Sequence, residues 1–410
     1  MLTRTCLLIT VLCMVLPAHA ATVQSMFDGR VLNASLMQPD DDRDEAFLII
    51  HGTWAHHGME IVQALQQGLA DRGVASLAPT LSLGQSDRKG FLDCAPMMTP
   101  DERTVVPEIR HWLDDLAARG YRTLTLLGHS RGALQAARVL IERPDLRVTR
   151  LVILGPMTWR YDEVTAGYCE QDTGALDTLL NKAREAPDAM LGPLKLQTCT
   201  GVRTTGSVFL DYYDASIVRH TPDLIEHVRI RTDVVLGTQD AISTWTAAEI
   251  SAAQLRTNVR LIRIEGADHF FRDLYMDEVL DGVLSPAVNL SALSPDEVQV
   301  LFIALSDCPV CRRMEQEVLY PLLRSSRLNG RAKVTELLLD DPRAIVGFDG
   351  KPTDTNTLAA FYSARMTPSL LFLDAQGIPL HPAITGYNET GFYAERVERA
   401  VDKAVEELRH

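Results

Sequence analysis

Short apolar runs alternate with longer segments of helical periodicity along the first 285 residues. Apolar runs predict buried strands, and six of them stand at 46–50, 74–78, 124–127, 151–154, 233–236 and 259–264. Segments with apolar residues every three or four positions predict helices at 60–72, 102–118 and 133–141. Strands that alternate with helices predict a mainly parallel sheet covered on both faces, so we expect an α/β fold.

Two stretches depart from this alternation. Residues 21–45 are polar and predict irregular structure. Residues 155–230 hold helix-like pieces at 173–185 and 222–228, and we expect them to form a cap inserted after a strand. Four aromatic residues of this cap could line an apolar acyl pocket or form its core: Tyr168, Phe209, Tyr212 and Tyr213.

The pattern changes after residue 285. Residues 286–296, counted with Ser285 before them, contain two Ser-Pro pairs and show no periodicity, which predicts a linker. A second α/β alternation then fills 297–410. Its predicted strands are at 298–305, 334–339 and 369–372, and a hairpin turn is predicted at 374–377. One helix begins shortly after the first strand and runs to about 323, and two others are predicted at 357–365 and 395–408.

Length and charge narrow the possible partners. A chain of 410 residues is long enough for two domains, each with its own core. The formal net charge of −14 argues against nucleic acid or an anionic membrane surface as the main partner.

The amino terminus has the pattern of a secretory signal peptide. Arg4 precedes an apolar run at 7–16, and Ala18 and Ala20 form a small-residue cleavage signal, so we expect cleavage after Ala20. The apolar run is too short for a membrane span. We therefore expect a periplasmic or secreted protein without a transmembrane segment.

Five cysteines remain after such a cleavage. Cys308 and Cys311 form a C-x-x-C, whereas Cys94, Cys169 and Cys199 allow one disulfide and leave one thiol over. The sequence alone does not choose that pair.

Residues 128–132, Gly-His-Ser-Arg-Gly, lie between a predicted buried strand and a predicted helix. In this G-x-S-x-G arrangement a strained turn presents the Ser130 hydroxyl at the end of the strand, and Gly128 and Gly132 avoid collisions with the turn. The helix that starts at Arg131 directs its free amide groups toward negative charge that develops beside Ser130.

On these residues, the region from about 46 to 284 resembles the α/β-hydrolase family, and we expect the whole domain to span 21–285. The resemblance implies a triad in the order serine, acid, histidine, which Ser130, Asp240 and His269 match just past strand ends. Asp233 or Asp268 remain alternatives for the acid. The oxyanion donors are then the backbone N–H groups of Arg131 and Thr53, with Trp54 as the alternative to Thr53.

Other histidines near these motifs invite different interpretations. His129 is expected to pack, and His51 to support the oxyanion loop. His51, His56 and His57 could suggest a metal site, but they lack the spacing of a zinc motif, so we expect neither a metal nor another cofactor.

The C-x-x-C opens a helix directly after a strand, which is typical of a redox motif in which Cys308 attacks and Cys311 resolves. Residues 297–410 resemble the thioredoxin family, which implies a cis peptide before Pro368 and backbone contacts from Thr367 to a bound partner. Phe302 and Asp307 stand where that family has a buried aspartate and a tryptophan, which puts a proton relay in question. A zinc site and a purely structural disulfide are the competing interpretations.

We therefore expect an exported serine hydrolase that cleaves carboxylic esters or thioesters of small molecules and carries a thioredoxin-like redox domain. A redox partner protein could react at Cys308. The main alternative is a thiol–disulfide oxidoreductase whose hydrolase-like half is a binding or docking module. A structural interaction protein is the third possibility.

Overall fold

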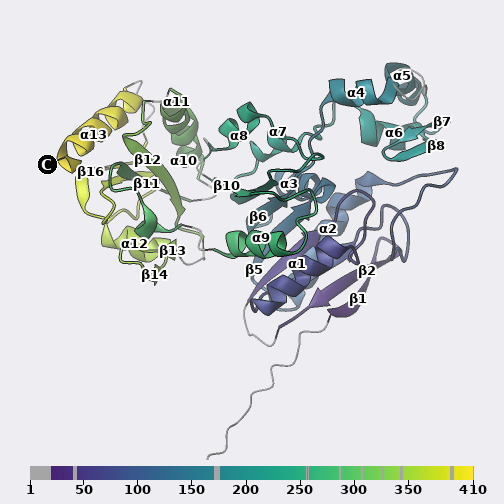
Figure 1. The fold of residues 1–410 in the computed structure, drawn as a ribbon, viewed down its shortest axis with the longest axis horizontal. Coiled ribbons are helices and arrows are strands. Elements are labelled where there is room, and N and C mark those ends of the chain that lie inside the picture. The colour runs from purple at the N-terminus through teal and green to yellow at the C-terminus, as the bar shows by residue number, and fades with distance from the viewer. Residues whose placement is uncertain are drawn as a thin grey trace, which may run out of the picture.

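The computed structural model describes residues 20–39, 44–169, 176–254, 256, 258–285, 288–305, 308–325, 327–341, 345–387 and 392–409. The predicted signal peptide, apart from Ala20, and Asp307 lie outside these residues. Two α/β units follow each other along the chain, and Figure 1 shows them side by side.

The first unit is built on an eight-stranded sheet in the order β1-β2-β4-β3-β5-β6-β9-β10. Its strands are β1 (Ala20–Phe27), β2 (Arg30–Met37), β3 (Glu45–Ile50), β4 (Ala75–Thr80), β5 (Thr123–His129), β6 (Val148–Leu154), β9 (Arg231–Gly237) and β10 (Val259–Ile264). All pairs from β4 to β10 are parallel, whereas β1 and β2 are antiparallel to their neighbours. The predicted mainly parallel sheet is confirmed.

Helices cover both faces of this sheet, as the alternation of strands and helices predicted. The helices are α1 (Glu60–Asp71), α2 (Val105–Ala118), α3 (Arg131–Glu142) and α9 (Leu274–Leu284). Phe47 and Ile49 of β3 pack in one core with α1 and α9. Leu48 and Ile50 face the opposite core, formed with α2 and α3. Strand β3 is therefore apolar on both faces because each face is buried.

The prediction of irregular structure for residues 21–45 is wrong for most of that stretch. β1 and β2 form an antiparallel hairpin at the edge of the sheet. The turn residues Asp28 and Gly29 both have positive φ, 48° and 73°. An Asp-Gly pair at such a turn is a hairpin signal, and apolar residues in the flanking strands are interleaved with polar ones.

The cap follows β6 and contains more elements than predicted. Its predicted helical pieces correspond to α5 (Leu176–Glu185) and α7 (Thr221–Ile225). The structure adds α4 (Tyr161–Cys169), the hairpin β7 (Met190–Leu196) and β8 (Cys199–Thr205), and α6 (Gly206–Tyr213). A further helix, α8 (Ala247–Gln254), follows β9 and contacts β10 and α7. A disulfide joins Cys94 to Cys199, which settles the open pairing, and Cys169 ends α4.

The four cap aromatics are all buried. Tyr168, Phe209 and Tyr213 pack on one another, with ring centroids 4.9 to 6.1 Å apart. They therefore form the core of the cap rather than an open acyl pocket, which decides between the two expectations.

The second unit has a four-stranded sheet in the order β12-β11-β15-β16. Its elements are β11 (Val298–Ala304), α10 (Pro309–Met314), a π-helical segment (Glu315–Leu319), α11 (Tyr320–Arg324), β12 (Ala332–Leu338), α12 (Thr355–Phe361), β15 (Ser369–Leu373), β16 (Pro379–Thr385) and α13 (Tyr393–Leu408). β11 is completely buried. Leu290, in the predicted linker, packs in this core, so part of the linker belongs to the second unit.

Among the described residues, no helix combines the length and the apolar character that crossing a bilayer requires.

Candidate active site

Ser130 lies between β5 and α3 in a left-handed backbone conformation, with φ 55° and ψ −119°. A Cβ atom on Gly128 would overlap the carbonyl of Gly132, and one on Gly132 would overlap the carbonyl oxygens of Ile50 and His51. Glycine is therefore required on both sides of the turn. The strained turn presents Ser130, which is partly exposed, at the carboxyl edge of the sheet.

Asp240 and His269 follow β9 and β10 at the same edge of the sheet. The Asp240 Oδ2 atom lies 2.8 Å from Nδ1 of His269. Its Oδ1 accepts hydrogen bonds from the backbone N–H groups of Ile242 and Ser243, each at 2.8 Å. Burial would raise the pKa of Asp240, but the bonds from His269 and Ser243 outweigh burial and the pKa lies below its usual range. The group is thus a carboxylate that fixes the orientation of the imidazole.

The two alternative acids are engaged elsewhere. Asp233 is completely buried and forms ion pairs with Arg150 and Arg260. Asp268 is exposed and pairs with Arg272. The geometry therefore favours Asp240 as the partner of His269.

Backbone contacts connect Ser130 to the Asp240–His269 pair. The Ser130 N–H donates to the carbonyl of Leu154 at 3.0 Å. A Cβ atom on the following residue, Gly155, would lie 3.3 Å from both Asp240 Oδ2 and His269 Nδ1. The end of β6 thus lies between the serine and the pair, and a side chain at 155 would fill the space beside the imidazole.

The loop after β3 lies against Ser130. A Cβ atom on Gly52 would be 3.3 Å from the Cβ of Ser130, so Thr53 follows immediately after the point of closest approach. Trp54 has a left-handed backbone, with φ 54°. Arg131 is the first residue of α3, so its backbone N–H belongs to the free amino end of that helix.

His51 and His129 support this arrangement. Nδ1 of His51 bonds to the carbonyl of Gly52 and Nε2 accepts from the N–H of Leu81, while burial and the charge of Arg88 lower its pKa to about 3. Nε2 of His129 donates to the carbonyl of His269 at 2.9 Å, and burial beside His269 lowers its pKa to about 4. Both rings are neutral near pH 7. The expected packing role of His129 thus includes a contact that positions the loop of His269.

A buried polar network beside Ser130 was not predicted. Glu102 accepts hydrogen bonds from Arg131, Gln135 and Tyr212, and the Tyr212 hydroxyl accepts one from Trp54. No spacing rule links residues 54, 102, 131 and 212. The one available signal was an arginine inside the G-x-S-x-G motif, which requires an acid if it is buried.

The cysteines of the C-x-x-C are bonded to each other. Cys308 caps α10, its Sγ accepts from the Cys311 N–H at 3.1 Å, and Pro309 occupies the first helical turn. The Thr367–Pro368 peptide is cis, as the resemblance implied. Phe302 is buried in β11.

Carboxylates approach this disulfide from other elements. A small cavity beside Cys311 is lined by Glu315 and Glu336 together with Arg229, Arg256 and Asn258 of the first unit. The surroundings of the Cys308–Cys311 disulfide therefore include side chains from both units.

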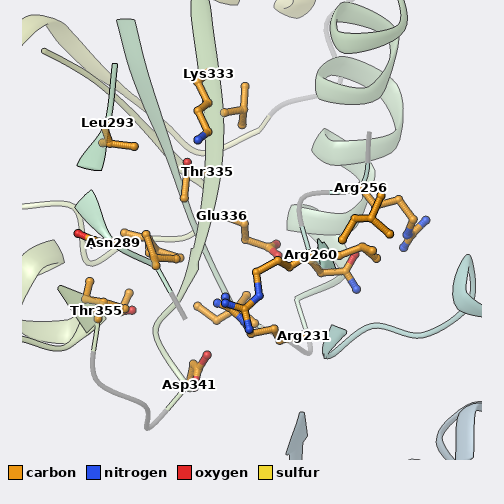
Figure 2. Close-up of a pocket in the computed structure, with 18 of the residues that line it drawn as sticks. Arg231, Arg256, Arg260, Asn289, Leu293, Lys333, Thr335, Glu336, Asp341 and Thr355 are labelled. Atoms are coloured by element: carbon orange, nitrogen blue, oxygen red, sulfur yellow. The ribbon is translucent and has the colours of Figure 1, made fainter. Parts of the chain in front are cut away.

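Two larger cavities lie between the two units. One of about 560 Å³ is lined by Arg231 and Arg260 on one side and by Lys333 and Glu336 on the other (Figure 2). Another of about 600 Å³ lies between β6 and β12. Among the described residues that line these two cavities, Ser130 does not appear, so both cavities lie away from the serine turn. Among the described residues, no group of three or more His, Cys, Asp or Glu side chains is arranged to hold a metal ion.

Comparisons with known proteins were consistent with this architecture. The model of the alpha/beta hydrolase family matches residues 47–281, and that of a thioredoxin-like domain matches residues 291–399. No curated protein matches the chain significantly.

Solved structures that resemble the chain match about two thirds of its length. Est1E from Butyrivibrio proteoclasticus with bound ferulic acid is 20% identical over 64% of this chain and 96% of its own, with a TM-score of 0.44. A thioesterase domain from the curacin biosynthetic pathway is 16% identical over 65% and 98%, with a TM-score of 0.41. A soluble variant of monoglyceride lipase from Saccharomyces cerevisiae is 13% identical over 66% and 94%, with a TM-score of 0.47.

The family model covers more than half of the chain and includes the serine turn, Asp240 and His269. The chain is therefore a member of the alpha/beta hydrolase family that carries a C-terminal thioredoxin-like domain.

Proposed function

We propose that the protein is a serine hydrolase that cleaves carboxylic ester or thioester bonds of small molecules. The observation that carries the proposal is the 2.8 Å contact between His269 and Asp240 at the sheet edge where Ser130 occupies a left-handed turn. A charged acid, an oriented imidazole and a hydroxyl presented at a helix amino end are the parts that acyl transfer needs.

In this mechanism Ser130 attacks the carbonyl carbon of the substrate while Nε2 of His269 takes the hydroxyl proton. Asp240 accepts from Nδ1 and stabilises the imidazolium that forms. The N–H groups of Arg131 and Thr53 stabilise the oxyanion. His269 returns the proton to the departing alcohol or thiol. In the second half of the reaction water attacks the acyl-serine while His269 takes a proton from it, and His269 then returns that proton to the departing Ser130 oxygen.

The test is turnover of short-chain p-nitrophenyl esters and acyl thioesters by the purified protein and by Ser130→Ala. We expect turnover by the wild type, a loss of about 10⁴-fold or more in the variant, and labelling of Ser130 by a fluorophosphonate probe in the wild type only. Equal turnover by the variant would refute the proposal.

A second activity is favoured by the C-terminal disulfide at the start of α10 and by the cis Thr367–Pro368 peptide, which directly precedes β15. In the reduced protein the Cys308 thiolate would attack a substrate disulfide and release one thiolate. Cys311 would then displace the other thiol and leave Cys308 and Cys311 oxidised. Insulin reduction that is lost in Cys308→Ser and retained in Ser130→Ala would support this activity as independent of the triad.

We also propose export to an oxidising compartment. The apolar run at 7–16 with Ala18 and Ala20 supports a cleaved leader, and the Cys94–Cys199 bond is of the kind that such compartments maintain. Amino-terminal sequencing of the mature protein should begin at Ala21, and an intact Met1 would contradict the proposal.

A further inference from the structure

A buried carboxylate lies directly behind the serine turn. Glu102 begins a 3-10 turn (Glu102–Thr104), and only 7% of its side chain is exposed. Its Oε1 accepts from Nε of Arg131 at 3.1 Å and from the Tyr212 hydroxyl at 2.9 Å, and its Oε2 accepts from Nε2 of Gln135 at 3.1 Å. Three donors from α3 and the cap thus converge on one acid.

The network continues to the loop after β3. Nε1 of Trp54 donates to the Tyr212 hydroxyl at 2.8 Å. The Arg131 guanidinium lies 4.5 Å from the centre of the Tyr212 ring, within cation–π range. A continuous chain of contacts therefore runs from Trp54 through Tyr212 and Glu102 to Arg131.

One end of this chain of contacts, Arg131, carries a proposed oxyanion donor, and the other end, Trp54, adjoins the second. Arg131 supplies one donor from its own backbone, and Trp54 directly follows Thr53, which supplies the other. Trp54 and Ser130, the neighbour of Arg131, have positive φ values of 54° and 55°. Side chains with a Cβ adopt this conformation only where the surroundings hold them in it.

The charge state of Glu102 makes the network stiff. Burial would raise the pKa of Glu102, but the Arg131 charge and the bonds from Tyr212 and Gln135 outweigh burial and the pKa lies below its usual range. A buried carboxylate that loses one partner is strongly penalised, so the partners are held in one arrangement.

The same network reaches the cap. Tyr212 belongs to α6, and Glu102 follows a loop that the Cys94–Cys199 disulfide ties to β8. Two backbone hydrogen bonds add to this tie, from Met98 N–H to the Arg203 carbonyl at 2.9 Å and from Arg203 N–H to the Pro96 carbonyl at 2.8 Å. The position of the cap and the position of the oxyanion donors are thus mechanically connected.

We propose that Glu102 and Tyr212 are positioning residues that hold the backbone N–H groups of both oxyanion donors in place and couple their position to that of the cap. The inference rests on the proposed serine hydrolase function and goes beyond it, because neither residue touches the reacting atoms. Oxyanion donors act at about 2.7 to 3.1 Å from the oxyanion. A small shift of Thr53 or Arg131 would therefore weaken stabilisation of the transition state more than binding of the substrate.

The experiment compares Tyr212→Phe and Glu102→Gln with two matched controls. Tyr213→Phe removes the hydroxyl of the neighbouring residue, which accepts from the N–H of Gln197 within the cap. Glu108→Gln neutralises another buried acid, which accepts from the N–H of Ser82. Active-site titration with a fluorophosphonate first counts the competent molecules, so that partial unfolding is not mistaken for slower chemistry.

We expect kcat per titrated site for a p-nitrophenyl ester to fall roughly 10-fold in Tyr212→Phe and more in Glu102→Gln, with KM within about twofold. The affinity for a trifluoromethyl ketone, which forms an oxyanion on Ser130, should fall by the same factor as kcat/KM. The double variant should lose no more than about the larger single loss, because both changes break one network. Both controls should keep the wild-type kcat.

Unchanged kcat per site in Tyr212→Phe and Glu102→Gln would overturn the inference while leaving the hydrolase function intact. A rise in KM with constant kcat would also overturn it, because the network would then act on substrate binding alone. A wild-type protein that neither turns over esters nor reacts with the fluorophosphonate would instead refute the hydrolase function, and this inference with it.

Discussion

Ser130 and Cys308 occupy equivalent places in the two halves of the chain, but their surroundings differ. Each lies between the end of a buried strand and the start of a helix, β5 and α3 for Ser130, and β11 and α10 for Cys308. Ser130 has a left-handed backbone at φ 55°, whereas Cys308 has an ordinary extended one at φ −115°. The serine turn is strained and the cysteine turn is not.

The proposed chemistry of the two residues accounts for the difference. A hydroxyl does not ionise near neutral pH, so as a nucleophile Ser130 would need a base and an acid, and in the proposed mechanism His269 and Asp240 supply them from loops after two other strands. A thiol ionises more easily, and the helix amino end that follows it already favours the thiolate. We therefore expect distant changes to disable the serine site and leave the cysteine site intact.

The largest effect should come from Asp240→Asn. The amide cannot stabilise the imidazolium and favours the wrong tautomer of His269, so we expect ester turnover to fall by about 10⁴-fold while insulin reduction is unchanged. Asp268→Asn, an exposed acid on the loop of His269, is the matched control and should retain turnover. A similar loss in both variants would argue against a specific role for Asp240.

The next largest effect concerns the glycines. Gly132→Ala forces a methyl group into the carbonyl oxygens of Ile50 and His51, and we expect a loss of about 3 kcal/mol or more in the free energy of unfolding. Gly167→Ala in α4 meets open space and should be neutral or slightly stabilising. Chemical denaturation of both variants checks the difference, and a tolerated Gly132→Ala would contradict the packing described for the turn.

The two disulfides should differ in their contribution to stability. The Cys94–Cys199 bond joins residues 105 apart in sequence, whereas Cys308 and Cys311 are 3 apart. Because a cross-link stabilises by restricting the unfolded chain, replacing the long-range pair by serines should cost about 3 kcal/mol and replacing the short pair much less. Thermal unfolding of the two double variants tests this, and equal losses would show that the C-x-x-C has a structural role.

The last expected effect is a pH dependence of the free energy of unfolding that arises from Glu108 in the first unit. Burial raises the pKa of Glu108 from 4.5 to about 7. The unfolded chain gives up this proton at lower pH than the folded one, so the free energy of unfolding should fall as pH rises from about 4.5 to about 7. In urea titrations across this range, the free energy of unfolding should fall less in Glu108→Gln than in the wild type, and the two falls should differ by at most about 3 kcal/mol. Parallel pH profiles would contradict a raised pKa.

Local patterns predicted most of the architecture. A strand buried on both faces and a strained turn each restrict the residue types over a few consecutive positions. Such elements can therefore be predicted locally, as were the strands at 46–50 and 124–127 and the turn at Gly-His-Ser-Arg-Gly. The hairpin at 20–37 was missed although Asp28-Gly29 marks its turn. The hairpin at 190–205 was missed because neither strand is a continuous apolar run: Gly192 and Pro193 interrupt the first strand, and the second strand is mostly polar.

The sequence by itself determined two α/β units, a serine turn that requires glycine on both sides, and a cysteine pair at the start of a helix. Only the tertiary structure decided that Asp240 rather than Asp233 meets His269, that Cys94 pairs with Cys199, and that Glu102 links Arg131 to Tyr212. The physical reason is range. Turns and helix starts depend on neighbours along the chain, whereas a buried charge is satisfied by whichever partners the packing of distant segments brings within 3 Å.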